Sequence, residues 1–211
     1  MSAQTDDRAG KAREMVIVMV LSLTAVLTAW SGFESSKWGG SMSINFSKAS
    51  SQRIEASRQA THADAARAID LQVFGIYLKA VSEDDQRLAD FAQERFTPHF
   101  DVAFTEWKST KPLKNPSAPK SPFELDSYIP PGAIKATAAD ERADALFQEG
   151  LDDNARGDRY TLLTVLFALV LFFAAFATRI GSRALSWTLV AMTSALMVVG
   201  IAFLAALPKL L

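Results

Sequence analysis

The sequence predicts an all-α integral membrane protein with three transmembrane helices and an antiparallel helical bundle in the loop between the first two. Three apolar segments, residues 15–33, 160–178 and 184–207, contain no Asp, Glu, Lys, Arg or His. Of 22 Lys and Arg and 23 Asp and Glu, all but nine lie within residues 34–159. In that segment apolar residues recur at helical spacing, and no strand pattern competes with it.

The first apolar segment, residues 15–33, reads MVIVMVLSLTAVLTAWSGF. Its 19 residues would extend about 28 Å as a helix, which is enough to cross a bilayer. The alternative is a cleaved signal peptide, because Arg8, Lys11 and Arg13 precede the apolar run. Trp30, a residue typical of membrane interfaces, stands where a signal peptide would have small residues. We therefore favour a membrane span.

The second and third apolar segments, residues 160–178 and 184–207, are separated only by residues 179–183. Two spans that are so close in sequence must form a helical hairpin. Gly181 suits the turn, and Pro208 follows the last apolar residue, so it ends the third helix.

The orientation follows from the basic residues in the short segments that flank the spans, since long loops cross membranes regardless of charge. Residues 1–14 and 179–183 both carry Lys or Arg and lie on the same side of a three-span topology. They are predicted to be cytoplasmic, which places residues 34–159 and the tail 208–211 outside the cytoplasm. The basic residues that determine this prediction are Arg8, Lys11, Arg13, Arg179 and Arg183.

A long helix, or two nearly collinear helices, is predicted for residues 41–81 after a break at Gly39 and Gly40. Residues 47–68 offer mainly small side chains, which suit either close packing against a neighbouring helix or a solvated stalk. The second half carries an apolar stripe that we expect to pack. Its members are Ile69, Leu71, Val73, Phe74, Ile76, Leu78 and Ala80.

Two amphipathic helices are predicted next. Ser82 is expected to cap the first, and Thr97 with Pro98 at the first helical position begins the second. Residues 111–132 hold six of the eight prolines and are predicted to follow an extended path. A last exterior helix, residues 133–156, leads back to the membrane.

One set of aromatic residues recurs at helical spacing in these two helices. It comprises Phe91, Phe96, Phe100, Phe104 and Trp107. The residues could form the hydrophobic core of the bundle or line a pocket for an apolar ligand. We favour the core.

The sequence gives little support for a catalytic, metal-binding or nucleic-acid-binding site. There is no Cys, and the two histidines, His62 and His99, fall on different predicted helices, so no metal site or cofactor is expected. The acidic clusters at residues 83–85 and 152–153 lie near predicted helix ends, where capping and solvation account for them. With 16 basic and 20 acidic residues, segment 34–159 has no basic face for nucleic acid. No catalytic motif occurs.

The spans contain hydroxyl groups as their only polar side chains, whereas pumps and proton relays use intramembrane ionisable residues. The sequence thus favours a non-enzymatic accessory, scaffold or assembly subunit. Its expected partners are membrane lipids and either further copies of the chain or another envelope protein. Two alternatives stay open, a ligand- or lipid-sensing module acting through a partner, and an oligomeric pore.

Several strings resemble a group of uncharacterised bacterial three-span membrane proteins. They are AWSGFESSKWGG at the end of the first apolar segment and just after it, ERFTPHF with AFTEW, SPFELDSYIPPG, and ARGDRYTLLTVLFALVLFF. The likeness covers most of the chain. It implies the same architecture and a multi-pass location in the bacterial plasma (inner) membrane, and it implies no activity and no site.

Overall fold

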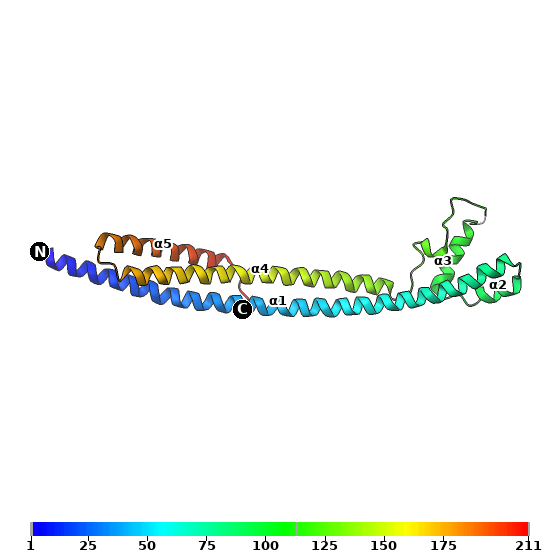
Figure 1. Cartoon of the computed structure of the whole chain (residues 1–211), viewed down its shortest axis with the longest axis horizontal. Coiled ribbons are helices and arrows are strands. Elements are labelled where there is room, and N and C mark those ends of the chain that lie inside the picture. The colour runs from blue at the N-terminus through cyan, green and yellow to red at the C-terminus, as the bar shows by residue number, and fades with distance from the viewer. Residues whose placement is uncertain (1, 113, 211) are drawn as a thin grey trace. The chain divides into compact units, whose positions relative to one another are not determined.

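The computed structural model describes residues 2–112 and 114–210, and within them every regular element is helical (Figure 1). The elements are α1 (Ser2–Ser82), α2 (Gln86–Gln93), α3 (Pro98–Ser109), the short 3-10 helix η1 (Pro122–Glu124), α4 (Ala133–Ala177) and α5 (Arg183–Ala206). The chain divides into two compact units, which we describe separately. Unit 1 comprises Met1–Ser47 and Phe147–Leu211, and unit 2 comprises Lys48–Leu146.

Three helices are long and apolar enough to cross a membrane. They lie within Gly10–Ser82, Ala133–Ala177 and Ala184–Ala206. Many large apolar side chains on these segments point away from the protein, as in Leu162, which is 69% exposed. Such exposure is expected of side chains that face lipid. The prediction of an all-α chain with three helices able to span a membrane is therefore confirmed.

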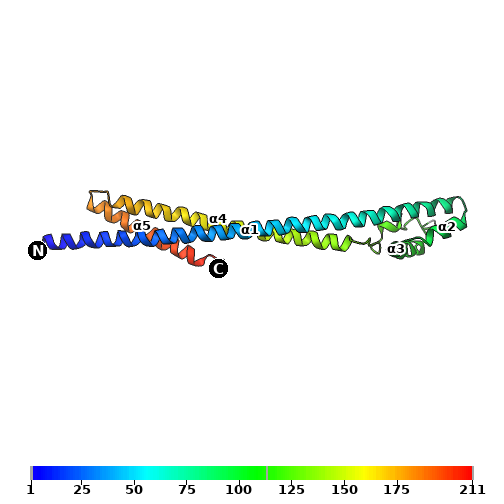
Figure 2. The same cartoon turned by 90° about the horizontal axis from the view of Figure 1, so that it is seen from below.

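Unit 1 is built from the first part of α1, the second part of α4, and α5 (Figures 1 and 2). Three clusters of buried apolar side chains join these helices. Phe167 is fully buried in the largest cluster, and a Cβ placed on Gly200 would lie 2.5 Å from its ring. A Cβ on Gly150 would likewise lie 2.5 Å from the ring of Phe46. Glycine at these two positions of α5 and α4 lets neighbouring helices approach closely.

The break predicted at Gly39 and Gly40 is wrong, because α1 continues through both residues. A glycine in a helix costs about 1 kcal/mol relative to alanine, and packing can outweigh that penalty. At this level of α1, Trp38 is buried against Tyr160 of α4. Gly157 of α4 also lies close to α1, at the Ser35 carbonyl and the Trp38 side chain.

In unit 2, α1 and α4 lie side by side along a seam of small residues (Figures 1 and 2). The buried members of the seam are Ala49, Ala56 and Ala63 on α1, with Ala139 and Ala143 on α4. The α1 alanines are seven residues apart, so they share one face, as in a coiled coil. Arg53 Nη2 donates to Asp144 Oδ1 at 2.8 Å beside the seam. Of the two interpretations for residues 47–68, close packing applies to this face.

Gly132 immediately precedes the return helix α4, at a point where the chain nearly touches α1. Its φ is +96°, and a Cβ there would lie 2.6 Å from the backbone oxygen of Gln59. We expect Gly132→Ala to lower the free energy of unfolding of unit 2 by about 1–2 kcal/mol, because alanine is disfavoured at positive φ. Amide hydrogen exchange across residues 48–146 of the full chain would measure this loss.

Gly75 provides the control for this prediction. It lies inside α1, and a Cβ placed on it would meet no atom within 4 Å, so Gly75→Ala should be neutral or stabilising by about 0.5–1 kcal/mol. Equal effects of the two substitutions on exchange would contradict the close approach at Gly132.

The apolar stripe predicted on α1 is only partly buried. Phe74 and Ala80 are buried, whereas Ile69, Leu71, Ile76 and Leu78 are between 45% and 55% exposed. The face of α1 that packs in unit 2 is centred on Asp70, Phe74 and Tyr77. The four exposed residues therefore flank that face on its two sides.

The predicted cap at Ser82 is also wrong. Ser82 is the last residue of α1, and its hydroxyl donates to the Lys79 carbonyl at 2.7 Å. Asp84 then adopts a φ of +57°, and Asp85 caps α2 by accepting a hydrogen bond from the Leu88 amide at 3.0 Å. Aspartate suits both positions, because its short side chain tolerates a positive φ at residue 84 and accepts the capping hydrogen bond at residue 85.

Candidate functional site: a buried polar network in unit 2

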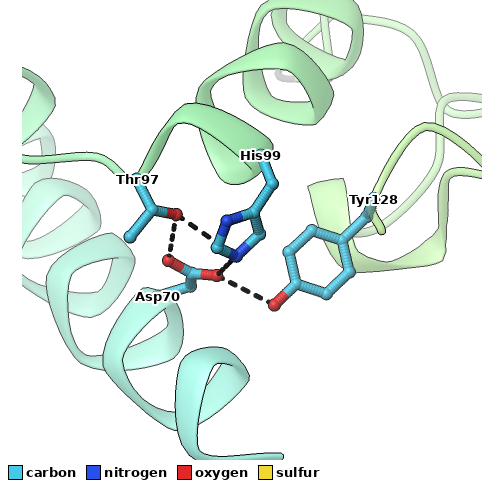
Figure 3. A network of polar contacts seen from close by, with 4 residues as sticks. All are labelled: Asp70, Thr97, His99 and Tyr128. Carbon is cyan, nitrogen blue, oxygen red and sulfur yellow. Dashed lines mark hydrogen bonds and ion pairs between the residues drawn. The ribbon is translucent and has the colours of Figure 1, made fainter. Parts of the chain in front are cut away.

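The most strongly organised polar group in unit 2 is the carboxylate of Asp70, which is 1% exposed (Figure 3). Its Oδ1 accepts a hydrogen bond from Thr97 Oγ1 at 2.6 Å. Its Oδ2 contacts His99 Nε2 at 2.7 Å and accepts from the Tyr128 hydroxyl at 2.9 Å. We call these four residues the Asp70 network. It joins α1, the start of α3 and the loop after η1.

Local structure brings the donors to Asp70. Thr97 is the N-cap residue of α3 and Pro98 its first residue, as the sequence predicts. The Thr97 side chain makes no capping bond within α3 and donates to Asp70 instead. The carboxylate therefore lies beside the N-terminal end of α3, where the helix dipole favours negative charge.

An aromatic core packs beneath the network. Its buried members are Phe74, Phe100, Ala103, Phe104, Trp107 and Tyr128. The Phe100 ring makes edge contacts with Phe74 and Phe96 and stacks on Phe123 at 5.0 Å. The Trp107 indole donates to the Pro119 carbonyl at 2.8 Å, which fastens the proline-rich loop to α3.

The five aromatic residues that the sequence singles out do not all lie together. Phe100, Phe104 and Trp107 are buried in the aromatic core, and Phe96 is half-buried against it. Phe91 is 51% exposed on α2, where the guanidinium of Arg95 lies 3.3 Å from its ring centre.

The basic residues that determine the predicted orientation belong to unit 1. Arg13 Nη1 donates to Ser186 Oγ at 3.3 Å, which puts the N-terminal part of α1 beside the start of α5. The Ser186 hydroxyl in turn donates to the Ala177 carbonyl. Arg179 lies in the turn before α5, whereas the side chains of Arg8 and Arg183 lie outside the described part of the structure. Lys11 is exposed on α1.

A second group of polar contacts lies in unit 1. Asp153 is buried, accepts from Asn45 at 3.0 Å and pairs with Arg156 at 3.0 Å. The Arg156 guanidinium lies over the Trp38 ring. Nearby on α1, the fully buried Glu34 accepts a hydrogen bond from the Leu210 amide at 3.1 Å, so it holds the C-terminal tail.

Burial raises the pKa of Tyr128 above its ordinary value of 10.0, and the hydrogen bond to Asp70 and the charge of Asp70 raise it further, against a smaller opposing effect of Arg67. The phenol therefore stays protonated and continues to donate. The pKa of Tyr128 is higher in the folded than in the unfolded protein. The stabilisation that its hydrogen bond to Asp70 contributes is therefore fully present below about pH 10 and is lost as the pH rises above that value.

We expect Tyr128→Phe to lower the free energy of unfolding of unit 2 by about 1.5–3 kcal/mol at pH 8, the range for hydrogen bonds to charged groups. The deficit relative to the wild type should shrink between pH 10 and pH 11, since only the wild type loses the contribution there. Hydrogen exchange of the full chain at pH 8 and at pH 11 measures the deficit at each pH. Tyr77→Phe is the control, and a deficit independent of pH would contradict the prediction.

The Asp70 network is suited to holding elements together and not to catalysis. A catalytic triad uses one imidazole nitrogen toward the nucleophile and the other toward the carboxylate. Here the same nitrogen, His99 Nε2, faces both Asp70 and Thr97. Among the described residues no group of three or more His, Asp or Glu could hold a metal ion.

The sequence interpretation did not single out Asp70, Thr97, His99 and Tyr128 as a group, and it considered His99 only as a possible metal ligand. The His99 side chain is 17% exposed and bonded to Asp70. One signal was present in the sequence. Asp70 follows Ala49, Ala56 and Ala63 at the same seven-residue spacing, which marks a carboxylate at a buried helical position.

Comparisons with known proteins do not assign this chain to a family. No protein-family model, no curated protein sequence and no solved structure matches it.

Proposed function

We propose that the chain is a non-enzymatic accessory or scaffold subunit of the bacterial inner membrane. In this proposal residues 34–159 form an antiparallel helical bundle outside the cytoplasm, and the bundle docks on a protein partner, either a second copy of the chain or another envelope protein. The observation that carries the proposal is the exposure of large apolar side chains on α1 within unit 2, outside the three apolar segments.

The buried polar groups support a structural and not a catalytic role. Both carboxylate oxygens of Asp70 are engaged by donors from the same unit. Asp153 in unit 1 is likewise engaged by Asn45 and Arg156. Carboxylates that are occupied in this way stabilise a unique arrangement of helices and are not free to act as bases.

Two exposed isoleucines mark the surface that we expect to dock. Ile69 is 55% exposed and Ile76 is 47% exposed. They are seven residues apart on α1, so they lie on one face of the helix. We call them the isoleucine stripe. Exposed apolar side chains that share a face are typical of protein interaction surfaces.

The orientation in the proposal rests on the basic residues of the short flanking segments. The contact of Arg13 with Ser186 supports the three-span topology from which the orientation is counted, because it brings the segment before the first span to the same end of unit 1 as the turn before α5. The resemblance of the sequence to uncharacterised bacterial three-span proteins supports the inner-membrane location.

The test is to extract the full chain under mild conditions into polymer nanodiscs and to measure its mass by light scattering. We expect an assembly heavier than one 23.0 kDa chain. The double substitution Ile69→Asp and Ile76→Asp should dissociate it, because charges in an apolar interface are strongly unfavourable.

A matched control adds the same two charges on another face of α1. Ser57 and Ala68 are exposed, and Ser57→Asp with Ala68→Asp should leave the assembly intact. A wild-type particle containing a single chain would overturn the proposal. So would an assembly that the isoleucine substitutions leave unchanged.

A further inference from the structure

Unit 2 contains a pocket of about 390 Å³ where the end of α1 meets α3 and the start of the proline-rich loop. Its apolar lining residues, which we call the apolar wall, are Tyr77, Leu78 and Val81 of α1, Trp107 of α3 and Pro112. Leu78 and Val81 are 45% and 38% exposed, so apolar surface is open to the pocket. The volume lies in the range of sites for small ligands.

The remaining lining residues, which we call the basic wall, are three lysines, Lys108, Lys111 and Lys114. They belong to a local excess of basic charge, because residues 108–123 contain four lysines and no acidic residue. This excess stands out in segment 34–159, which has more acidic than basic residues. Among the described residues, none of the three ammonium groups is paired with a carboxylate.

The backbone around the lysines is held in place. Lys111 has a φ of +55°, and its carbonyl accepts hydrogen bonds from the amides of Lys114 at 2.8 Å and Asn115 at 2.9 Å. Trp107 is fixed by its bond to the Pro119 carbonyl. The basic wall and the apolar wall are thus positioned by separate contacts within unit 2.

We propose that this pocket binds an anionic lipid. The lysines hold the charged headgroup, and the alkyl chain lies along Leu78, Val81 and Trp107. An acidic peptide would use the lysines and leave the apolar wall exposed, and an uncharged lipid would use the apolar wall and leave three unpaired ammonium groups. An anionic headgroup joined to an alkyl chain satisfies both walls.

The test uses the full chain in phosphatidylcholine nanodiscs and exploits the absence of native Cys. Val81→Cys carries an environment-sensitive fluorophore in the pocket, and Val102→Cys, an exposed position on α3 that does not line the pocket, carries the control label. The titrants are lysophosphatidylglycerol, lysophosphatidylcholine of the same chain length, glycerol phosphate, and vesicles containing phosphatidylglycerol.

We expect a saturable response of the Val81 label to lysophosphatidylglycerol and none of the control label. Lys108→Gln with Lys114→Gln should weaken the binding about 30-fold. Lys111 is kept because of its backbone conformation. Lys48→Gln with Lys135→Gln, which removes two exposed lysines of unit 2 outside the pocket, should leave binding unchanged.

Four outcomes would overturn the proposal. They are the absence of a saturable response to lysophosphatidylglycerol, an equal response to the zwitterionic lipid, an equal response to glycerol phosphate, and a response to vesicles alone. The third would indicate a site for free phosphate esters, and the fourth would indicate docking on a membrane surface.

Discussion

Replacing Phe100 with alanine is expected to lower the free energy of unfolding of unit 2 by about 3–5 kcal/mol, the largest effect of any single apolar substitution considered for this chain. The Phe100 side chain is fully buried and contacts five other aromatic rings of the aromatic core. Its removal would leave a cavity bounded by rigid rings that cannot collapse to fill it.

This substitution also decides between the two interpretations of the aromatic residues. If they form the core, amide hydrogen exchange of residues 48–146 in Phe100→Ala should accelerate throughout unit 2. If they line a ligand pocket, the protein without ligand should lose little stability. Phe91→Ala is the control, because Phe91 is 51% exposed and contacts Arg95, and its loss should cost less than about 1 kcal/mol.

The second large effect is expected for Asp70→Ala, at about 3–5 kcal/mol. The substitution removes the acceptor that Thr97, His99 and Tyr128 share, and it leaves their polar groups without that partner in a buried site. Because the three donors come from α3 and the loop, we expect hydrogen exchange to accelerate first there and less in the seam with α4.

Asp70→Asn sharpens this prediction. Asparagine has the same shape and keeps one oxygen acceptor, so the loss should be smaller than for alanine. A substitution of another acidic residue outside the network, Asp64→Ala on the exposed side of α1, should have almost no effect. Equal stability of the wild type and Asp70→Ala would show that the network does not hold unit 2 together.

The three candidate spans could be predicted from the sequence because about 19 or more consecutive, mainly apolar residues with few or no charges are a strong local signal for a span. The start of α3 was also predictable, since Thr97 followed by Pro98 fits only one helix position well. These features depend only on residues that are close in sequence, so packing against distant residues does not change them.

Features that depend on packing were not predictable in the same way. Gly39 and Gly40 signal a break locally, yet α1 continues because α4 packs against it near Trp38 and Gly157. The burial of Asp70 depends on donors that lie 27, 29 and 58 residues further along the chain. A single sequence does not reveal such pairs, although the spacing of Asp70 from Ala63 indicated the buried face.

The exposure of Ile69 and Ile76 could not be predicted either, because an apolar stripe looks the same whether it packs within the chain or against a partner. The central residues of that stripe pack in the aromatic core, whereas the residues on its two sides are exposed. The proposed role as a scaffold subunit rests on the exposure of these two isoleucines.

The proposal requires that unit 2 face the exterior, and the orientation can be measured directly. A cysteine at Lys120, in the exposed proline-rich loop, should react in intact bacterial cells with a maleimide that cannot cross the inner membrane. A cysteine at Ser182, in the turn before α5, should react only after the cells are permeabilised. Labelling at position 120 only after permeabilisation would place the helical domain in the cytoplasm and contradict the proposal.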